Sequence, residues 1–376
     1  MRTFSCRKKG FNRFITLFLL LILLQVMPFS GYGQWGISLL PGTVIKHTEN
    51  LRFDPPKQAY GVVFNMPLVN KKLRHWHAYY GFPEVSMKVG YQDFNLQEVL
   101  GEAFYCMPEL RIYPLKEDFS FQPVISFATG LAYINRKYDF SDNPTNNAIS
   151  SSLDNVTAFG LGVEYKASLP HRLYTGIRLT HFSNANVKQP NLGVNLLVAE
   201  LGYAYQFREK ATEIQEEDKP RRYFFAEMSG TFALSEYSVP GGPKYPNYNA
   251  GFMLGIPISA FQSVLVYPFW QKRDVERVFP KNVFDLEEDE EGDAGEKYAV
   301  AIGLENRFGD LAISVFYGRY IIEKGNSSST KGFNLIRLQY IIHINENLDL
   351  APGLQFKSKQ ITAQYIGVLL GLRLKK

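Results

Sequence analysis

The stretch that decides the fold runs from Leu173 to Ser183 and reads LYTGIRLTHFS. Every second residue from Leu173 to Leu179 is apolar or a threonine, and the same parity continues to His181 and Ser183. Alternate residues of a β-strand share one face, so this period of two predicts a strand with a base and a hydroxyl on its apolar side. Such a pair suits a surface that faces lipid and a substrate that comes from the membrane.

The same period recurs elsewhere in the chain. In residues 296–308 and 361–374, apolar side chains alternate with positions that hold mostly small or charged residues. An apolar outward face over a small, polar interior is the pattern of a transmembrane β-barrel. Aromatic residues make up 15% of the chain, and no segment after residue 33 approaches the ~20 apolar residues of a membrane-spanning helix. The alternative is a soluble exported β-protein with its apolar faces inside.

The strands fall into two runs of about eight, so we predict an all-β protein with two antiparallel outer-membrane barrels. Residues 34–207 form the first barrel and residues 222–376 a second eight-stranded, barrel-like domain of unknown role. The charged residues 208–221 lack apolar periodicity and are interpreted as a linker. The alternative is a single sixteen-stranded barrel with a long turn. The candidate strands are 35–46, 58–68, 83–93, 98–114, 119–136, 155–168, 172–183 and 195–207, then 222–237, 247–258, 262–271, 296–308, 311–323, 332–343, 348–358 and 361–374.

The connections alternate in length. Tight turns at residues 259–261, 309–310 and 345–347 alternate with longer polar loops at 238–246, 272–295 and 324–331. Outer-membrane barrels have short turns on the periplasmic side and long loops outside. The same alternation makes residues 168–172 an inner turn, so the strand that follows runs outward and His181 lies at its outer end.

The first 33 residues have the form of a secretory signal peptide. Five basic residues precede the apolar run Phe14–Val26, and small residues follow at 31–33. The alternative is a lone N-terminal membrane anchor. These five basic residues account for the whole formal charge of +5, so the remaining chain is neutral and no nucleic-acid partner is expected. Cys6 lies in the signal, which leaves Cys106 alone and excludes an intramolecular disulfide.

No metal or cofactor signature was found, so neither a metal nor a cofactor is predicted. The acidic run 285–293 lacks the alternating oxygen-ligand spacing of a calcium loop and is interpreted as a solvated outer loop.

The segment His181–Asn195 contains the residue types that serine ester hydrolysis needs. A serine nucleophile requires a base within hydrogen-bond reach, a group that orients this base, and donors for the oxyanion. Ser183 supplies the nucleophile and His181 the base. Asn195 would lie beside His181 across the hairpin. Asn184 begins the loop and offers an amide to the oxyanion.

This segment resembles the motif of PagL-type lipid A 3-O-deacylases, a family of outer-membrane acyloxyacyl hydrolases. The shared pattern is His-x-Ser-Asn-Ala from His181, then Lys-Gln-Pro-Asn and a glycine, and the resemblance covers about residues 35–207. It implies an eight-stranded barrel that removes the ester-linked 3-hydroxyacyl chain from the 3 position of lipid A at its lipid-facing surface. By this match His181 is the base, Ser183 the nucleophile and Asn184 an oxyanion donor.

Two positions depart from the family pattern. Asn195 occupies the place of the glutamate that completes the triad, and Glu200 cannot replace it because its parity puts it on the inner face. Asn186 stands where the family commonly has a glycine whose backbone N–H helps to bind the oxyanion. The alternative to a hydrolase is therefore a catalytically weakened or inactive barrel that acts as a structural or lipid-binding protein.

The resemblance also implies a location and a partner. The chain would be exported to the outer membrane of a Gram-negative cell and would bind lipopolysaccharide, through its lipid A, in the outer leaflet. The oligomeric state is left open, a homodimer included.

Overall fold

The structure is a computed structural model. It describes residues 34–68, 73–115, 119–168, 170–206, 222–236, 240–278, 295–324, 332–359 and 362–376. The predicted signal peptide 1–33, the whole linker 208–221 and the acidic run 285–293 lie outside the described residues.

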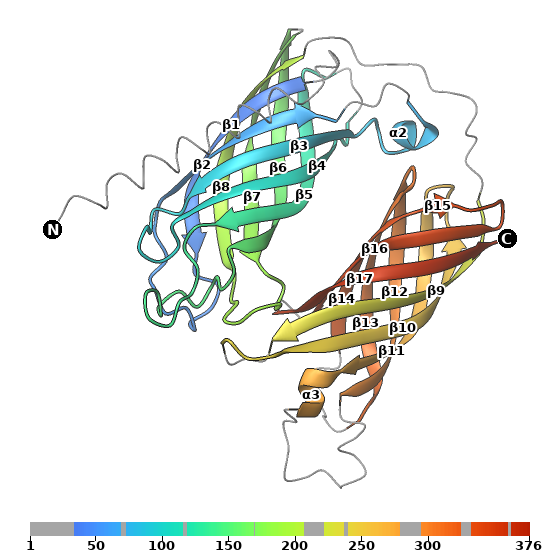
Figure 1. The fold of residues 1–376 in the computed structure, drawn as a ribbon. Coiled ribbons are helices and arrows are strands. Elements are labelled where there is room, and N and C mark those ends of the chain that lie inside the picture. The colour runs from blue at the N-terminus through green and yellow to red at the C-terminus, as the bar shows by residue number, and fades with distance from the viewer. Residues whose placement is uncertain are drawn as a thin grey trace.

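Within the described residues, the first eight strands form a closed antiparallel barrel (Figure 1). The barrel closes because β1 pairs with β2 on one side and with β8 on the other. The strands are β1 (Gln34–Ile45), β2 (Ala59–Pro67), β3 (Glu84–Asp93), β4 (Glu102–Ile112), β5 (Phe121–Ile134), β6 (Leu153–Ser168), β7 (His171–Ser183) and β8 (Val194–Gln206).

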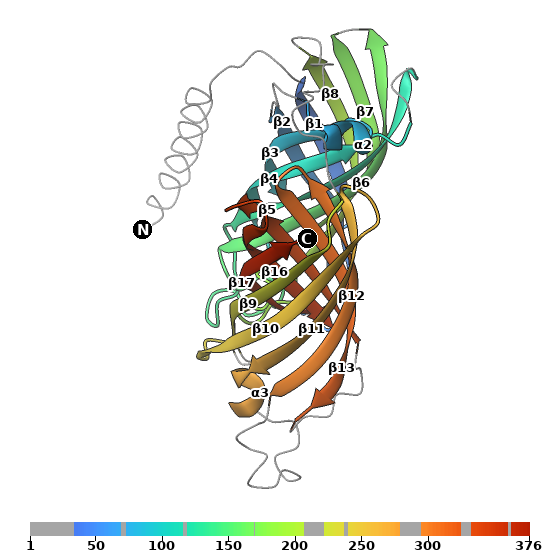
Figure 2. The same ribbon diagram turned by 90° about the vertical axis from the view of Figure 1, so that its right-hand side faces the viewer.

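A second antiparallel barrel follows, which Figure 1 shows as a separate body; in the turned view of Figure 2 the two barrels overlap. Its sheet closes through the pairing of β14 with β16, so the alternative of one sixteen-stranded barrel is wrong. The predicted strand 332–343 ends early, and a short strand, β15, follows it. In the described part of the chain this half contains β9 (Phe225–Glu236), β10 (Lys244–Pro257), β11 (Gln262–Arg273), β12 (Glu296–Phe308), β13 (Leu311–Glu323), β14 (Gly332–Tyr340), β15 (Ile342–His343), β16 (Leu348–Lys359) and β17 (Thr362–Lys375).

The apolar faces of both barrels point outward. Ile177 of the first barrel is 57% exposed and Ile302 of the second is 62% exposed, whereas Arg178 and Ala301, with the opposite parity, are buried. Every strand therefore places apolar side chains outside and pairs its backbone groups within the sheet, which is the arrangement of a transmembrane barrel. The prediction of an outward-facing apolar surface is confirmed.

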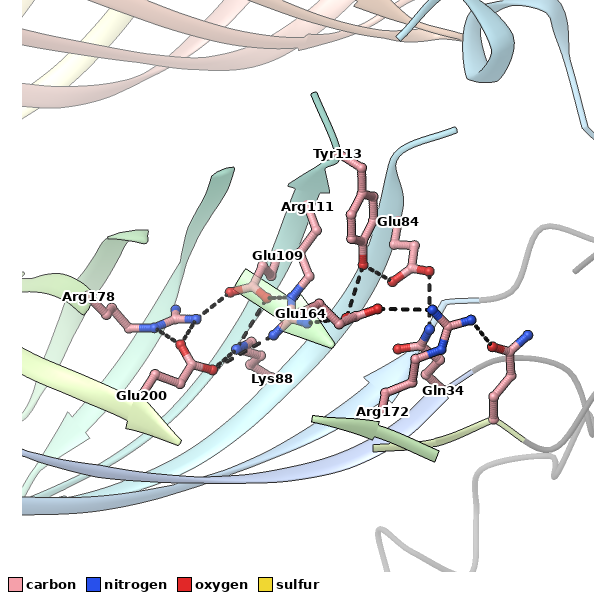
Figure 3. Close-up of polar contacts among 11 residues, drawn as sticks. Gln34, Glu84, Lys88, Glu109, Arg111, Tyr113, Glu164, Arg172, Arg178 and Glu200 are labelled. Atoms are coloured by element: carbon pink, nitrogen blue, oxygen red, sulfur yellow. Dashed lines mark hydrogen bonds and ion pairs between the residues drawn. The ribbon is translucent and has the colours of Figure 1, made fainter. Parts of the chain in front are cut away.

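A buried ion network fills the lumen of the first barrel (Figure 3). Arg178 lies 2.7 Å from Glu109 and 2.6 Å from Glu200, and Lys88 lies 2.8 Å from Glu200 and 3.2 Å from Glu109. Arg111 extends the network to Glu109 at 2.7 Å. Glu200 therefore faces inward, as its parity predicted. Buried charges tolerate a low dielectric only when they are paired, so each member depends on the others.

The second lumen combines ion pairs with aromatic rings. Arg373 lies 3.0 Å from Glu227 and 2.8 Å from Glu305. Arg337 stacks 4.0 Å above the centroid of the Tyr267 ring. Charge and ring packing thus fill this barrel as well.

Two short helices, α2 (His75–Tyr79) and α3 (Asp274–Val278), were not predicted. Among the described residues no helix is long and apolar enough to cross a membrane. Helix α2 and the residue after it join the two barrels at the ends opposite His181, since the Tyr80 ring stacks on Phe308 at 4.5 Å. Arg74 reaches Asp310 at 3.4 Å, and the Tyr79 hydroxyl donates to Gln262 at 2.8 Å.

We predict that Arg178→Met destabilises the first barrel by about 3–5 kcal/mol, because it removes one of the cations that Glu109 and Glu200 share and leaves two buried carboxylates with too little positive charge around them. Urea unfolding of the full chain in detergent, followed by tryptophan fluorescence, measures this loss. Glu49→Gln is the control, since it breaks only the exposed pair with Lys46 and leaves the midpoint unchanged. A loss below about 1 kcal/mol for Arg178→Met contradicts the dependence of the lumen on paired charge.

Candidate functional site

His181 and Asn195 meet across the hairpin of β7 and β8. They are directly paired in the sheet, and His181 Nδ1 lies 2.6 Å from Asn195 Oδ1. An amide oxygen only accepts, so Nδ1 carries the hydrogen and Nε2 is left as a proton acceptor. The neighbourhood predicted from parity is confirmed, and its geometry orients the imidazole as a general base requires.

Gly193 provides the space that the imidazole occupies. A Cβ at this position would lie 2.5 Å from His181 Cε1 and 3.2 Å from Nε2. Gly193 also has φ of +77°, in the left-handed region that favours glycine. Its backbone N–H donates to Ala148 O at 3.0 Å, which fixes the end of the loop beside the ring.

Ser183 ends β7 and is only 6% exposed. It shares the parity of His181, and the described side chains include no hydrogen bond between the two. Two residues along a strand span about 6.6 Å between Cα atoms, so the hydroxyl and Nε2 must approach each other for proton transfer. Catalytic hydrogen bonds are often long before substrate binds.

Asn184 anchors the loop to the neighbouring β5–β6 connection. Its side-chain nitrogen donates at 2.9 Å to both Ser150 Oγ and Ser151 Oγ. Ser150 in turn donates to Lys188 O at 3.0 Å. Both amide hydrogens of Asn184 are therefore engaged by the neighbouring connection in this structure, and its role as an oxyanion donor stays a prediction.

Backbone donors lie next in the loop. Ala185 has φ of +52° and Asn186 has φ of +71°. Asparagine tolerates this region better than most residues, so Asn186 can adopt it although it is not a glycine. Within the described residues, neither of these two backbone N–H groups makes a hydrogen bond. They are two unpaired donors at the second and third positions after Ser183.

A polar cluster on the outward face was missed by the sequence analysis. Asn155 of β6 pairs with Ser183, and Thr157 pairs with His181. Thr157 donates to Asn155 Oδ1 at 2.8 Å, and Asn155 donates to Thr129 Oγ1 at 3.1 Å. In the sequence, Asn155 and Thr157 are two polar residues that share the parity of the exposed Leu153 and Phe159 on either side of them. Only the pairing of β6 with β7 places them beside the site.

His47 also lies at this end of the barrel and was not predicted. Ile45 of β1 pairs with Asn195, which brings the following loop close to the site. His47 Nε2 lies 3.0 Å from Leu192 O, at the far end of the loop that starts at Asn184.

Residues 58–204 match the family model described as lipid A 3-O-deacylase (PagL). No curated protein matches the chain.

Among solved structures, the outer membrane enzyme PagL is 18% identical and covers 45% of this chain and 97% of its own, with a TM-score of 0.32. The KdgM porin is 9% identical, with 72% and 92% covered and a TM-score of 0.18. The translocator domain of the autotransporter NalP from Neisseria meningitidis is 6% identical, with 98% and 97% covered and a TM-score of 0.18.

The family match spans seven of the eight strands of the first barrel and includes the whole segment from His181 to Asn195. The resemblance predicted from the sequence is therefore confirmed, and the N-terminal barrel matches the lipid A 3-O-deacylase (PagL) family over residues 58–204.

Proposed function

We propose that the first barrel is an outer-membrane esterase that removes the ester-linked 3-hydroxyacyl chain from the 3 position of lipid A. The observation that carries this proposal is the 2.6 Å hydrogen bond between His181 and Asn195 on an outward-facing surface, inside the stretch that matches the PagL family. Lipopolysaccharide in the outer leaflet presents its acyl esters at the outer end of the strands, where this pair lies.

In this mechanism Ser183 Oγ attacks the ester carbonyl and gives its proton to His181 Nε2. The tetrahedral intermediate collapses, and the sugar oxygen leaves with that proton. A water molecule, deprotonated by the same nitrogen, then attacks the acyl-serine and releases the 3-hydroxy fatty acid. The unpaired backbone N–H groups of Ala185 and Asn186 are the proposed oxyanion donors, since such donors stabilise the charge that develops in the transition state.

Asn195 holds the imidazole by its oxygen but carries no charge. A carboxylate would also stabilise the imidazolium that forms during each proton transfer. This difference favours the second candidate function, a barrel of the same family that binds lipid A without cleaving it.

Ser183→Ala and His181→Ala are expected to lower the release of 3-hydroxy fatty acid from lipopolysaccharide by more than about 10⁴-fold, because each removes a partner of the proton transfer. Mass spectrometry of lipid A from outer-membrane preparations measures the release. Thr175→Ala and His171→Ala, farther down the same strand, are the controls that keep activity. If the unaltered chain releases no fatty acid, the esterase proposal fails and the lipid-binding function replaces it.

Asn195→Glu is expected to raise the rate or leave it intact, because the carboxylate keeps the acceptor for Nδ1 and adds charge. Asn195→Leu removes the acceptor and is expected to lower the rate by up to about 10⁴-fold, since the ring loses its tautomer and orientation. Both are measured as initial rates of fatty-acid release. A large loss for Asn195→Glu would mean that the asparagine has a role beyond accepting this hydrogen bond.

Gly193→Ala is expected to lower the rate by about 10²-fold without removing any reacting group, because its methyl would displace the imidazole. Gly241→Ala is the matched control: Gly241 also has positive φ, but a Cβ there meets nothing within 4 Å. Equal rates for the two variants would contradict the placement of the ring against Gly193.

A further inference from the structure

The loop between β7 and β8 contacts the second barrel as well as the first. The backbone N–H of Gln189 donates to the Glu236 carboxylate at the end of β9. In return the N–H of Glu236 donates to Asn186 O at 3.4 Å. Asn186 Nδ2 donates to Gln364 O, near the start of β17, at 3.4 Å. Two outer strand ends of the second barrel therefore hold the segment that carries the proposed oxyanion donors.

The position of Glu236 is unusual for a carboxylate. It continues the outward parity of Phe232 and Leu234, which are 46% and 37% exposed, yet Glu236 itself is 4% exposed. A carboxylate on an apolar outward face needs hydrogen-bond donors if it is to lose water. The loop of the first barrel covers it and supplies such a donor from Gln189.

The opposite side of the loop is held by the first barrel. Asn184 bonds to Ser150 and Ser151, and Leu192 N–H donates to Asn147 O at 3.2 Å. Contacts from the first barrel thus fix both ends of the loop, whereas Glu236 and Gln364 hold its middle. At the opposite ends of the barrels, the contacts of α2 also hold the two barrels beside each other. The barrels are therefore attached at both ends, by α2 and by the loop between β7 and β8.

We infer that Glu236 is a positioning residue for the esterase site, and that the second barrel thereby forms part of the catalytic unit. Glu236 holds the Gln189 N–H and so fixes the backbone at Ala185 and Asn186, whose N–H groups would bind the oxyanion. This inference rests on the proposed function for its consequence in catalysis, but the contact itself can be tested without activity.

Hydrogen–deuterium exchange of the full chain in detergent tests the contact. Glu236→Ala is expected to speed exchange of the backbone amides in peptides covering residues 184–190, because Gln189 loses its acceptor. Glu346→Ala, in an exposed turn at the opposite end of the same barrel, is the matched control and leaves the exchange unchanged. Unchanged exchange in Glu236→Ala overturns the inference, whether or not the chain is an esterase.

Kinetics of fatty-acid release test the consequence. Glu236→Ala is expected to lower kcat by about 10–100-fold with KM nearly unchanged, since a displaced donor costs transition-state rather than ground-state binding. Glu236→Gln keeps an acceptor for Gln189 and is expected to restore most of kcat. A normal kcat in Glu236→Ala, or equal losses in both variants, overturns the positioning role. If the unaltered chain releases nothing, the proposed function fails while the exchange result still decides the contact.

Discussion

Closure of the β-sheet is the constraint on which the rest of this structure depends. In hydrocarbon, an unpaired backbone group costs several kcal/mol, so a spanning sheet must pair its first strand with its last. The pairing of β1 with β8 and of β14 with β16 meets this demand twice in one chain. Closure also fixes which face of every strand is turned toward lipid. As a result, His181 and Asn195 face outward, whereas Glu200 is buried in the lumen.

The charged side chains in the lumen of the first barrel are buried in ion pairs. Arg178, Lys88, Glu109 and Glu200 are all buried, and each lies within hydrogen-bond or ion-pair distance of partners of opposite sign. With the lumen of the first barrel filled in this way, chemistry is left to the outward surface. A hydrogen-bonded imidazole and a polar cluster of Thr129, Asn155 and Thr157 stand out there because apolar side chains surround them.

The contacts with the second barrel give the loop between β7 and β8 a structural role that its own sequence does not indicate. By its own sequence the loop is a polar connection shaped by glycine, asparagine and proline. In the folded chain it bridges two barrels and covers a carboxylate on the surface of the second. A second barrel without a recognisable motif can thus contact the loop through one buried carboxylate and a few backbone groups, and such isolated contacts leave no residue pattern of their own.

The sequence by itself determined the strands, their parity and the shared face of His181, Ser183 and Asn195, because a period of two is a local property. It also determined the resemblance to PagL. Tertiary structure alone decided that the sheet closes as two barrels, that Asn184 is engaged with Ser150 and Ser151, and that Asn155, Thr157 and His47 join the site. These depend on which distant strands pair and in which register, and so does the burial of Glu236 beneath the loop. Register between distant strands is set by the whole packed sheet, so no single stretch of sequence contains it.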